Sequence, residues 1–425
     1  MLYPVYRFIY NIYFHPLSKF PGPRFAAATK IPIAWVSWNG RLSQWVNGLH
    51  TDYDSEVVRI SPDELDFIQP AAWKDIHMPA QGRPFGKDLL VFAGVQNIVT
   101  APDPDHRRLR RLVNHAFSDK ALREQEPLIA GHVRKLTCNL SSLASHEGKA
   151  NLTESFMYVV FDIISDLSFG KSFNCQESST HHVWVSQVID SITIVVLDSV
   201  AKRFPGLEYI IKFAVPTNIA QSRDNHFAWS AEQVQRRLNS EVERPDLLAY
   251  ITKKDQDPEK GGMSPEEVYQ TAAAFLAAGA ETTAAHSTAT IFFLLKHPAY
   301  HKQLVDEIRT EFASAEDICL QRIIEKLPFL QAIIDEVFRM YPPAIAGQPR
   351  VSPPGGGYVA GHFVAEGTGV QMNQYAANHS KFNFEDPEVF EPKRWLDEGK
   401  GIRGVNRREA MQPFGMGARN CVGKK

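Results

Sequence analysis

The apolar stretch 264–296 constrains the fold of this chain more than any other segment. It begins at Ser264, a residue that can cap a helix, and Pro265 and Glu267 follow at positions that favour a helix start. The stretch stays apolar on nearly all sides until the His-Pro pair at 297–298 stops it. A helix this long and this apolar is expected to cross the middle of a large core. The segment therefore predicts a large, mainly helical fold.

The rest of the chain adds helices and a smaller β portion. Residues 55–70 are predicted to form short strands, whereas residues 71–104, rich in Pro and Gly, are predicted to form a long loop. The pattern is mainly helical from 105 to about 345, and Gly- and Pro-rich loops with short strands follow. No segment resembles a linker. We therefore expect one domain over 25–425, mainly α with a smaller β portion.

The N-terminal segment 1–14 carries six aromatic side chains. Fourteen helical residues would extend about 21 Å, less than the roughly 30 Å of a bilayer core. Because Tyr and Arg are favoured where a membrane meets water, we interpret 1–14 as a membrane-interface segment. The alternative is a buried N-terminal helix. Residues 15–24 contain three prolines and one glycine, and we expect a stiff elbow that cannot be helical.

Charge and cysteine content exclude several classes of protein. The chain has 46 Lys and Arg against 48 Asp and Glu, so a bulk nucleic-acid binder is excluded. Its four cysteines, at 138, 175, 319 and 421, lack the spacing of a metal finger and indicate a reducing compartment. The basic stretch 106–111 is either a solvated face or a contact for carboxylates of a cofactor or an acidic partner.

The strongest chemical signal surrounds Cys421. Gly415, Gly417 and Gly423 allow the backbone to turn sharply and to approach a flat ligand closely. Arg419, two residues before the sulfur, favours the thiolate over the thiol. Such a thiolate can bind a soft metal, including haem iron. The alternative is an ordinary thiol on a glycine-rich surface loop.

A second cluster, Ala278–Thr283, lies midway along the long apolar segment. Gly279 and two threonines are weak helix formers, and Glu281 in an apolar helix would need a partner or a water-lined pocket. The cluster is typical of a helix loosened to admit water and a small ligand. The alternative is a glycine that allows close helix packing, with threonines at the surface.

A third cluster is a pair of opposite charges three residues apart, Glu336 and Arg339. The same spacing recurs elsewhere in the chain, so only its context distinguishes it. The pair ends a predicted helix, Phe329–Met340, directly before a Tyr-Pro-Pro turn. Arg394 could complete a buried charge cluster, because a buried pair needs further partners to offset its desolvation.

Together, these motifs resemble the cytochrome P450 family of haem-thiolate monooxygenases in their order and approximate spacing. The resemblance extends from about Tyr6 to the last residue. The segments HPLSKFPGPR and HRRLRR are similar to microsomal fungal members of secondary metabolism. The resemblance implies the cytochrome P450 fold, a large helical domain that encloses haem b (iron protoporphyrin IX).

The resemblance also implies roles for single residues. Cys421 would be the proximal iron ligand. Glu281 and Thr282 would be the acid and alcohol that deliver protons while oxygen is activated. His106 stands where many relatives have Trp. The further residues expected to contact the haem are Phe414, Gly415, Gly417, Arg419, Arg110, His106 and Arg350.

The implied activity is insertion of one atom of O2 into a lipophilic small molecule, in a step of secondary metabolite biosynthesis. Glu336, Arg339 and Arg394 would form a structural triad behind the haem. Electrons would come from NADPH through a separate cytochrome P450 reductase. The expected location is the cytosolic face of the endoplasmic reticulum membrane, with a short or truncated anchor. The alternatives are a haem-thiolate enzyme that rearranges its substrate without a reductase, and a non-catalytic remnant.

A departure from the family pattern at the C-terminal end leads to a further expectation. Only four residues follow Cys421, where relatives continue with a helix and a β hairpin. We therefore expect that this chain lacks those elements and either binds haem weakly or fails to fold stably. Substrate choice is expected to depend on the loops 75–104 and 185–225.

Overall fold

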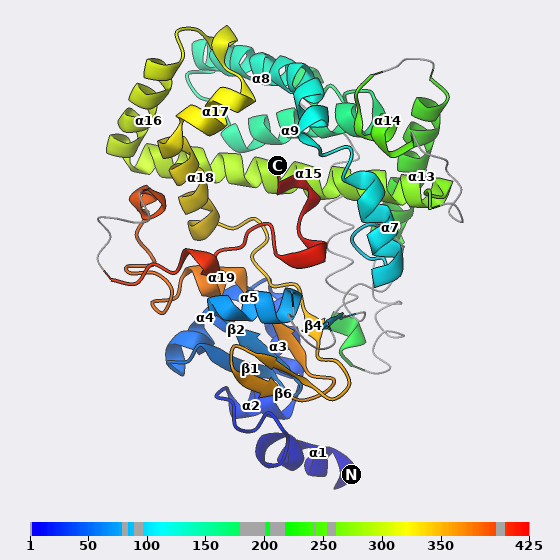
Figure 1. The fold of residues 1–425 in the computed structure, drawn as a ribbon, viewed down its shortest axis with the longest axis vertical. Coiled ribbons are helices and arrows are strands. Elements are labelled where there is room, and N and C mark those ends of the chain that lie inside the picture. Colours follow the sequence, from blue (N-terminus) through cyan, green and yellow to red (C-terminus); the bar gives the residue numbers. More distant parts are fainter. Residues whose placement is uncertain are drawn as a thin grey trace. The chain divides into compact units, whose positions relative to one another are not determined.

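The computed structural model describes eight stretches of the chain (Figure 1). Within them the protein is mainly helical with a small β portion, as the sequence predicted. The chain forms two compact units, and the predicted single domain over 25–425 stays a prediction. The first unit is Met1–Val91, Val196–Glu208 and Ala289–Asn420, and the second is Phe92–Val195, Tyr209–Thr288 and Cys421–Lys425. The described residues are 2–78, 84–88, 97–178, 200–204, 217–240, 244–252, 261–396 and 404–424.

The first unit contains a five-stranded sheet (Figure 1). The strands β1 (Val57–Ser61) and β2 (Glu64–Phe67) confirm the short strands predicted for 55–70. They pair antiparallel with each other, and β2 pairs in parallel with β7 (Gly369–Gln371). Next to β7 lie β4 (Arg350–Val351) and then β3 (Gly86–Lys87), both antiparallel to their neighbours. The sheet thus joins segments of the chain that are about 300 residues apart in sequence.

A separate hairpin and several helices complete the first unit. The hairpin pairs β5 (Gly357–Val359) with β6 (His362–Val364). The helices are α1 (Leu2–Tyr13), α2 (Arg24–Ala28), α3 (Ile31–Trp38), α4 (Leu42–Asp52), α5 (Pro70–His77), α16 (Pro298–Glu311), α17 (Leu320–Lys326), α18 (Pro328–Met340) and α19 (Gln374–Asn378), with the 3-10 helices η2 (Ala315–Asp317), η3 (Pro392–Trp395), η5 (Arg408–Ala410) and η6 (Gly417–Arg419).

Helix α5 corrects the prediction that 71–104 is one long loop. It begins with Pro70 in its first turn, where proline is tolerated, and buries Ala72, Trp73 and Ile76 along one face. Its apolar residues thus follow a helical spacing over two turns. The prolines and glycines farther along had extended the predicted loop too far towards the N-terminus.

The N-terminal segment is a helix whose aromatic side chains are exposed. Tyr3 and Phe14 are each 71% exposed, which contradicts the alternative of a buried helix. Asn11 fixes the helix by donating from Nδ2 to the carbonyl of Ala28 at 3.0 Å. The following elbow is non-helical up to Pro23, and Arg24 begins α2. Within the described residues, no helix is long and apolar enough to cross a membrane.

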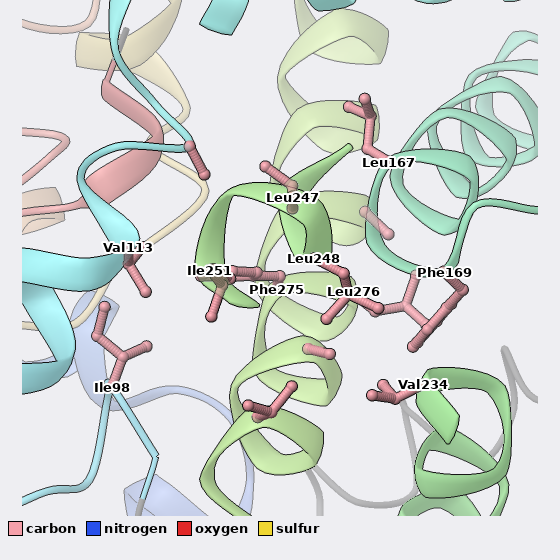
Figure 2. Packing of buried hydrophobic residues seen from close by; sticks show 14 of the residues in the cluster. Ile98, Val113, Leu167, Phe169, Val234, Leu247, Leu248, Ile251, Phe275 and Leu276 are labelled. Carbon is pink, nitrogen blue, oxygen red and sulfur yellow. The ribbon is translucent and has the colours of Figure 1, made fainter. Parts of the chain in front are cut away.

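The second unit is built from helices around α15 (Pro265–Lys296), which belongs to this unit up to Thr288. Figure 2 shows Phe275 and Leu276 of α15 among apolar side chains from neighbouring helices, including Phe169, Leu248 and Val234. These side chains form one continuous core. The other elements of the unit are α7 (Asp103–Val113), α8 (Asp119–Glu147), α9 (Leu152–Phe169), α10 (Cys175–Ser178), α13 (Thr217–Leu238), α14 (Leu247–Thr252) and η7 (Val422–Lys424).

The start of α15 has the predicted capping box. The backbone N–H of Ser264 donates to Glu267 Oε2 at 2.9 Å, and the N–H of Glu267 donates to Ser264 Oγ at 3.2 Å. Arg108 of α7 adds an ion pair with Glu267 and donates to the carbonyl of Gly262. Burial raises the pKa of Glu267, but the hydrogen bonds from Arg108 and Ser264 outweigh it and hold this pKa below its usual value.

A buried charge cluster holds the C-terminal part of the first unit together. Arg339 donates from Nε to Glu336 Oε2 at 2.9 Å and from Nη2 to Oε1 at 2.8 Å. The Nε of Arg394 lies 3.4 Å from Glu336 Oε1, and Trp395 Nε1 donates to Glu336 Oε2 at 2.9 Å. Neither Glu336 nor Arg339 is accessible to solvent. Burial lowers the pKa of Arg394, and the negative charge of Glu336 opposes this shift.

Glu336→Ala should prevent stable folding, because it leaves Arg339 and Arg394 buried without their carboxylate. We expect the free energy of unfolding to fall by about 3–5 kcal/mol, a large share of the total stability of a typical domain. Urea unfolding of purified protein measures the change. Glu325→Ala, at an exposed position of α17, is the control and should be nearly neutral. Equal stability of the two variants would contradict the structural role.

Glu267→Gln should destabilise the protein at neutral pH more than in acid. The folded pKa of Glu267 is depressed, so its stabilisation is present above the ordinary Glu pKa of about 4.3 and is lost as the pH falls through the folded value. At pH 7 the loss should be roughly 1.5–3 kcal/mol, the usual contribution of hydrogen bonds to a charged group. Urea unfolding at descending pH checks this. The exposed neighbour Glu266, changed to Gln, should show no such trend; a constant difference at every pH for Glu267→Gln would disprove the linkage.

Candidate functional site

The cysteine loop, Phe414–Gly423, adopts a shape that requires glycine at two positions. Gly415 and Gly417 have φ angles of 66° and 79°, in the left-handed region that other residues rarely adopt. A Cβ atom at Gly417 would also overlap the carbonyl oxygen of His77 at the end of α5. The backbone of the loop therefore lies directly against α5.

The N-terminal part of the loop rests on α18. The ring of Phe414 contacts the ring of Phe338 edge-on, with centroids 5.2 Å apart and an interplanar angle of 70°. Phe338 immediately precedes Arg339 of the buried charge cluster. Two predicted haem contacts, Phe414 and Gly417, thus lie against the helices that carry Phe338 and His77.

Cys421 itself belongs to the second unit and has an exposed side chain. Arg110 of α7, in the same unit, lies close enough for the charge of Cys421 to act on it. Burial lowers the pKa of Arg110, and the negative charge of Cys421 opposes that shift. The Nε of Arg110 also donates to Asn114 Oδ1 at 2.7 Å. Arg110 thus places a cation near the exposed cysteine.

This donor set suits a haem iron. A single exposed sulfur that can ionise is the ligand that haem-thiolate iron takes from a protein. Two glycines of the loop, Gly415 and Gly417, adopt left-handed conformations that turn the backbone before the cysteine. Arg110 beside the sulfur supplies a cation of the kind that pairs with carboxylates. The residues present therefore fit the group that the sequence motifs implied.

The residues of the basic stretch 106–111 differ in their exposure to solvent. His106 is 4% exposed, on the buried side of α7. Arg108 is paired internally with Glu267, whereas Arg107 and Arg111 are exposed. The prediction of a solvated basic face is therefore correct only for Arg107 and Arg111.

Arg350 of β4 is 4% exposed, and its two terminal nitrogens donate to Pro349 O and Gln348 Oε1, each at 3.1 Å. Burial and the charge of Arg350 lower the pKa of His77 to about 4, so His77 is neutral at physiological pH. The sequence motifs did not identify His77, because it lies in the segment that was predicted to be a loop. The four-residue spacing between Trp73 and His77 is the sequence signal that could have placed both residues on one face of a helix.

The middle of α15 differs from its prediction in two respects. The helix is continuous through 278–283 instead of loosened, and Glu281 and Thr282 are exposed, so Glu281 needs no buried partner. A Cβ atom at Gly279 would lie 3.2 Å from Ile164 Cδ1, so this glycine serves close packing against α9. The hydroxyl of Thr282 donates to the carbonyl of Ala278 at 2.7 Å. No hydrogen bond or ion pair in the described part of the chain joins Glu281 or Thr282 to Cys421.

Of the two loops expected to choose the substrate, 185–225 lies mostly outside the described residues, and 75–104 lies partly outside them. Arg419, a further expected haem contact, lies in the 3-10 helix η6 and is partly buried. The predicted roles of Arg419, His106 and Arg350 towards a haem stay predictions.

Comparison with known proteins identifies the same family as the sequence motifs. The family model described as Cytochrome P450 matches residues 67–425. The chain is 37% identical to cytochrome P450 monooxygenase astJ of Aspergillus oryzae, over 99% of this chain and 85% of that protein. It is 36% identical to cytochrome P450 monooxygenase efuB of Hormonema carpetanum, over 100% of this chain and 85% of that protein.

A solved structure shows the same fold at low sequence identity. The heme domain of cytochrome P450DA superimposes with a TM-score of 0.74 at 18% identity, covering 90% of this chain and 82% of that chain. The motif-based resemblance to fungal cytochromes P450 is thus confirmed by whole-length relatives from fungi. With the family model matched from β2 to the last residue, this chain belongs to the cytochrome P450 family.

Proposed function

We propose that this protein is a haem-thiolate monooxygenase that inserts one atom of O2 into a lipophilic small molecule during secondary metabolite biosynthesis. The observation that carries the proposal is the exposed sulfur of Cys421, presented by a loop with left-handed glycines and accompanied by Arg110. The names of the fungal relatives, which are cytochrome P450 monooxygenases, support the same reaction class.

In this proposal, Cys421 ligates the iron of haem b, which supplies the activation of molecular oxygen. The chain's own residues bind and orient that group. Arg110 lies near Cys421 within the second unit, and Arg419 precedes the cysteine by two residues in the sequence. Arg350 of β4 is proposed as a further haem contact. Their guanidinium groups suit the carboxylates of a porphyrin, and His106 is proposed to assist them from α7. Phe414, Gly415 and Gly417 would shape the loop that holds the group.

Glu281 and Thr282 are proposed to handle protons. Both side chains are exposed and adjacent on α15. The hydroxyl of Thr282 donates a hydrogen bond to the carbonyl of Ala278, which leaves lone pairs on Oγ1 that can accept a hydrogen bond from water. If the hydroxyl rotates away from Ala278, it can give its own proton to an acceptor while Oγ1 takes a proton from that water, so the hydroxyl is restored. The carboxyl of Glu281 is proposed to supply protons to the water.

NADPH is proposed as the electron source, through a separate cytochrome P450 reductase. We further propose that the protein lies at the cytosolic face of the endoplasmic reticulum membrane. The exposed aromatic side chains of α1 support this location, because tyrosine is favoured in the headgroup region of a bilayer. A reaction that proceeds without NADPH and reductase would instead favour the rearranging enzyme.

Cys421→Ser should abolish thiolate ligation. The reduced, CO-treated wild-type protein is expected to show the red-shifted Soret band of a thiolate ligand, and the variant should lack it, because a serine hydroxyl does not ionise at neutral pH. Absorption spectroscopy of purified protein with haem supplied measures this. Cys138→Ser, at another exposed cysteine, is the control and should keep the band. A wild-type protein without the band would refute the proposed function and favour a non-catalytic remnant.

Thr282→Ala should lower the amount of product formed, while the protein continues to consume electrons from NADPH. Without the hydroxyl, proton delivery fails and electrons are diverted to hydrogen peroxide. Product formed per NADPH should fall by roughly 10²-fold, the lower range for loss of general acid–base assistance. Haem content and substrate affinity should stay near the wild-type values. The matched control is Thr283→Ala, at the exposed neighbouring position. If both variants keep wild-type coupling, Thr282 has no role in proton delivery.

A further inference from the structure

The segment that leads into the cysteine loop, residues 410–412, is held by the side chain of Gln374. Gln374 opens α19 and is 3% exposed. Its Oε1 accepts from the backbone N–H of Gln412 at 2.9 Å, and its Nε2 donates to the backbone carbonyl of Ala410 at 3.3 Å. One amide group thus binds a donor and an acceptor of the same short segment, as a neighbouring strand would do.

This double contact requires an amide. Oε1 can only accept and Nε2 can only donate, so the two bonds fix the orientation of the side chain. A second donor, Trp73 Nε1 of α5, reaches the same carbonyl of Ala410 at 3.0 Å. The segment 410–412 is therefore hydrogen-bonded by side chains of α5 and α19, two helices that are far apart in the sequence.

Gln374 also connects this segment to the buried charge cluster. Its Nε2 donates to Asn378 Oδ1 at 2.6 Å, and the Nδ2 of Asn378 donates to the carbonyl of Arg339 at 2.9 Å. In turn, Arg339 donates a hydrogen bond from Nη1 to the carbonyl of Asn378 at 3.0 Å. A continuous chain of hydrogen bonds thus runs from Arg339 through Asn378 and Gln374 to the backbone of Gln412.

The position of Gln412 is transmitted to the cysteine loop by the next turn. The carbonyl of Gln412 accepts from the N–H of Gly415 at 2.9 Å, and Phe414 between them packs on Phe338. Displacement of 410–412 would therefore tilt the turn at Gly415 and move the backbone that continues to Cys421. Flexible glycines at 415 and 417 cannot resist such a shift on their own.

We propose that Gln374 is a positioning residue that fixes where the loop presents the Cys421 thiolate. The inference rests on the proposed haem-thiolate function and adds a residue outside every motif of the sequence. Gln374 acts through the backbone of Ala410 and Gln412, without touching the sulfur.

The first test compares Gln374→Met with Asn383→Leu in the full-length, haem-loaded protein. Both changes remove a buried amide of the first unit; Asn383 donates to the carbonyls of Ile68 and Ala377 and does not contact 410–412. Melting temperatures should fall in both. In the reduced CO complex, only Gln374→Met should shift from the thiolate type towards the non-thiolate type. The ratio of the two forms should change on the order of tenfold, as expected for one lost buried hydrogen bond.

The second test uses Gln374→Glu, which preserves shape. Its carboxylate can still accept from Gln412 but repels the carbonyl of Ala410 and Asn378 Oδ1; on protonation it regains a donor. The thiolate-type fraction of this variant, relative to wild type at each pH, should therefore rise as the pH is lowered. Loss of the band in wild type would refute the proposed function itself. Three outcomes would each overturn the positioning role. Gln374→Met could leave the thiolate-type band unchanged, or Asn383→Leu could shift it by the same amount. The third outcome is a thiolate-type fraction of Gln374→Glu, relative to wild type, that does not depend on pH.

Discussion

The buried guanidinium of Arg339 is the interaction on which the C-terminal part of the first unit depends. A guanidinium removed from water needs a partner for each of its donors, and here they reach Glu336 and the carbonyls of Asn378, Pro387 and Val389. Pro387 and Val389 lie in an irregular segment, and Asn378 is the last residue of α19. Because an unpaired charge would be so costly, the guanidinium dictates where these segments run.

The buried charge cluster and α5 together determine the position of the N-terminal part of the cysteine loop. Phe414 packs beside the charge cluster through Phe338, and Gly417 fits against the last carbonyl of α5. Neither contact is strong alone, but the two contacts hold the loop at two positions three residues apart. A loop with two left-handed glycines is flexible in isolation, so rigid neighbours must supply the order that a metal ligand requires. The chemistry of Cys421 is thus local, whereas its placement is a property of the surrounding helices.

Several features followed from the sequence because their causes are local. The capping box of α15 lies within four residues, and the structure shows both of its hydrogen bonds. The strands in 55–70 and the helix that ends at Met340 were also confirmed, since alternation and helical spacing act over one or two turns. Local reasoning failed at α5, where nearby prolines and glycines hid two turns of helix. It also failed at Glu281, whose exposure depends on which neighbours cover α15.

The sequence by itself determined the family, the glycine-bounded cysteine and the pairing of Glu336 with Arg339, because each depends on residue types at short spacing. Only the tertiary structure decided which distant groups meet. It brought Arg110 near Cys421, Trp73 to Ala410 and Gln374 to Gln412. The sequence does not indicate which partner a tryptophan or a glutamine will bind, since the bonds of Trp73 and Gln374 to residues 410–412 form across more than 30 residues. Their partners are selected when burial forces every polar group to be satisfied, and that requirement acts on the whole fold.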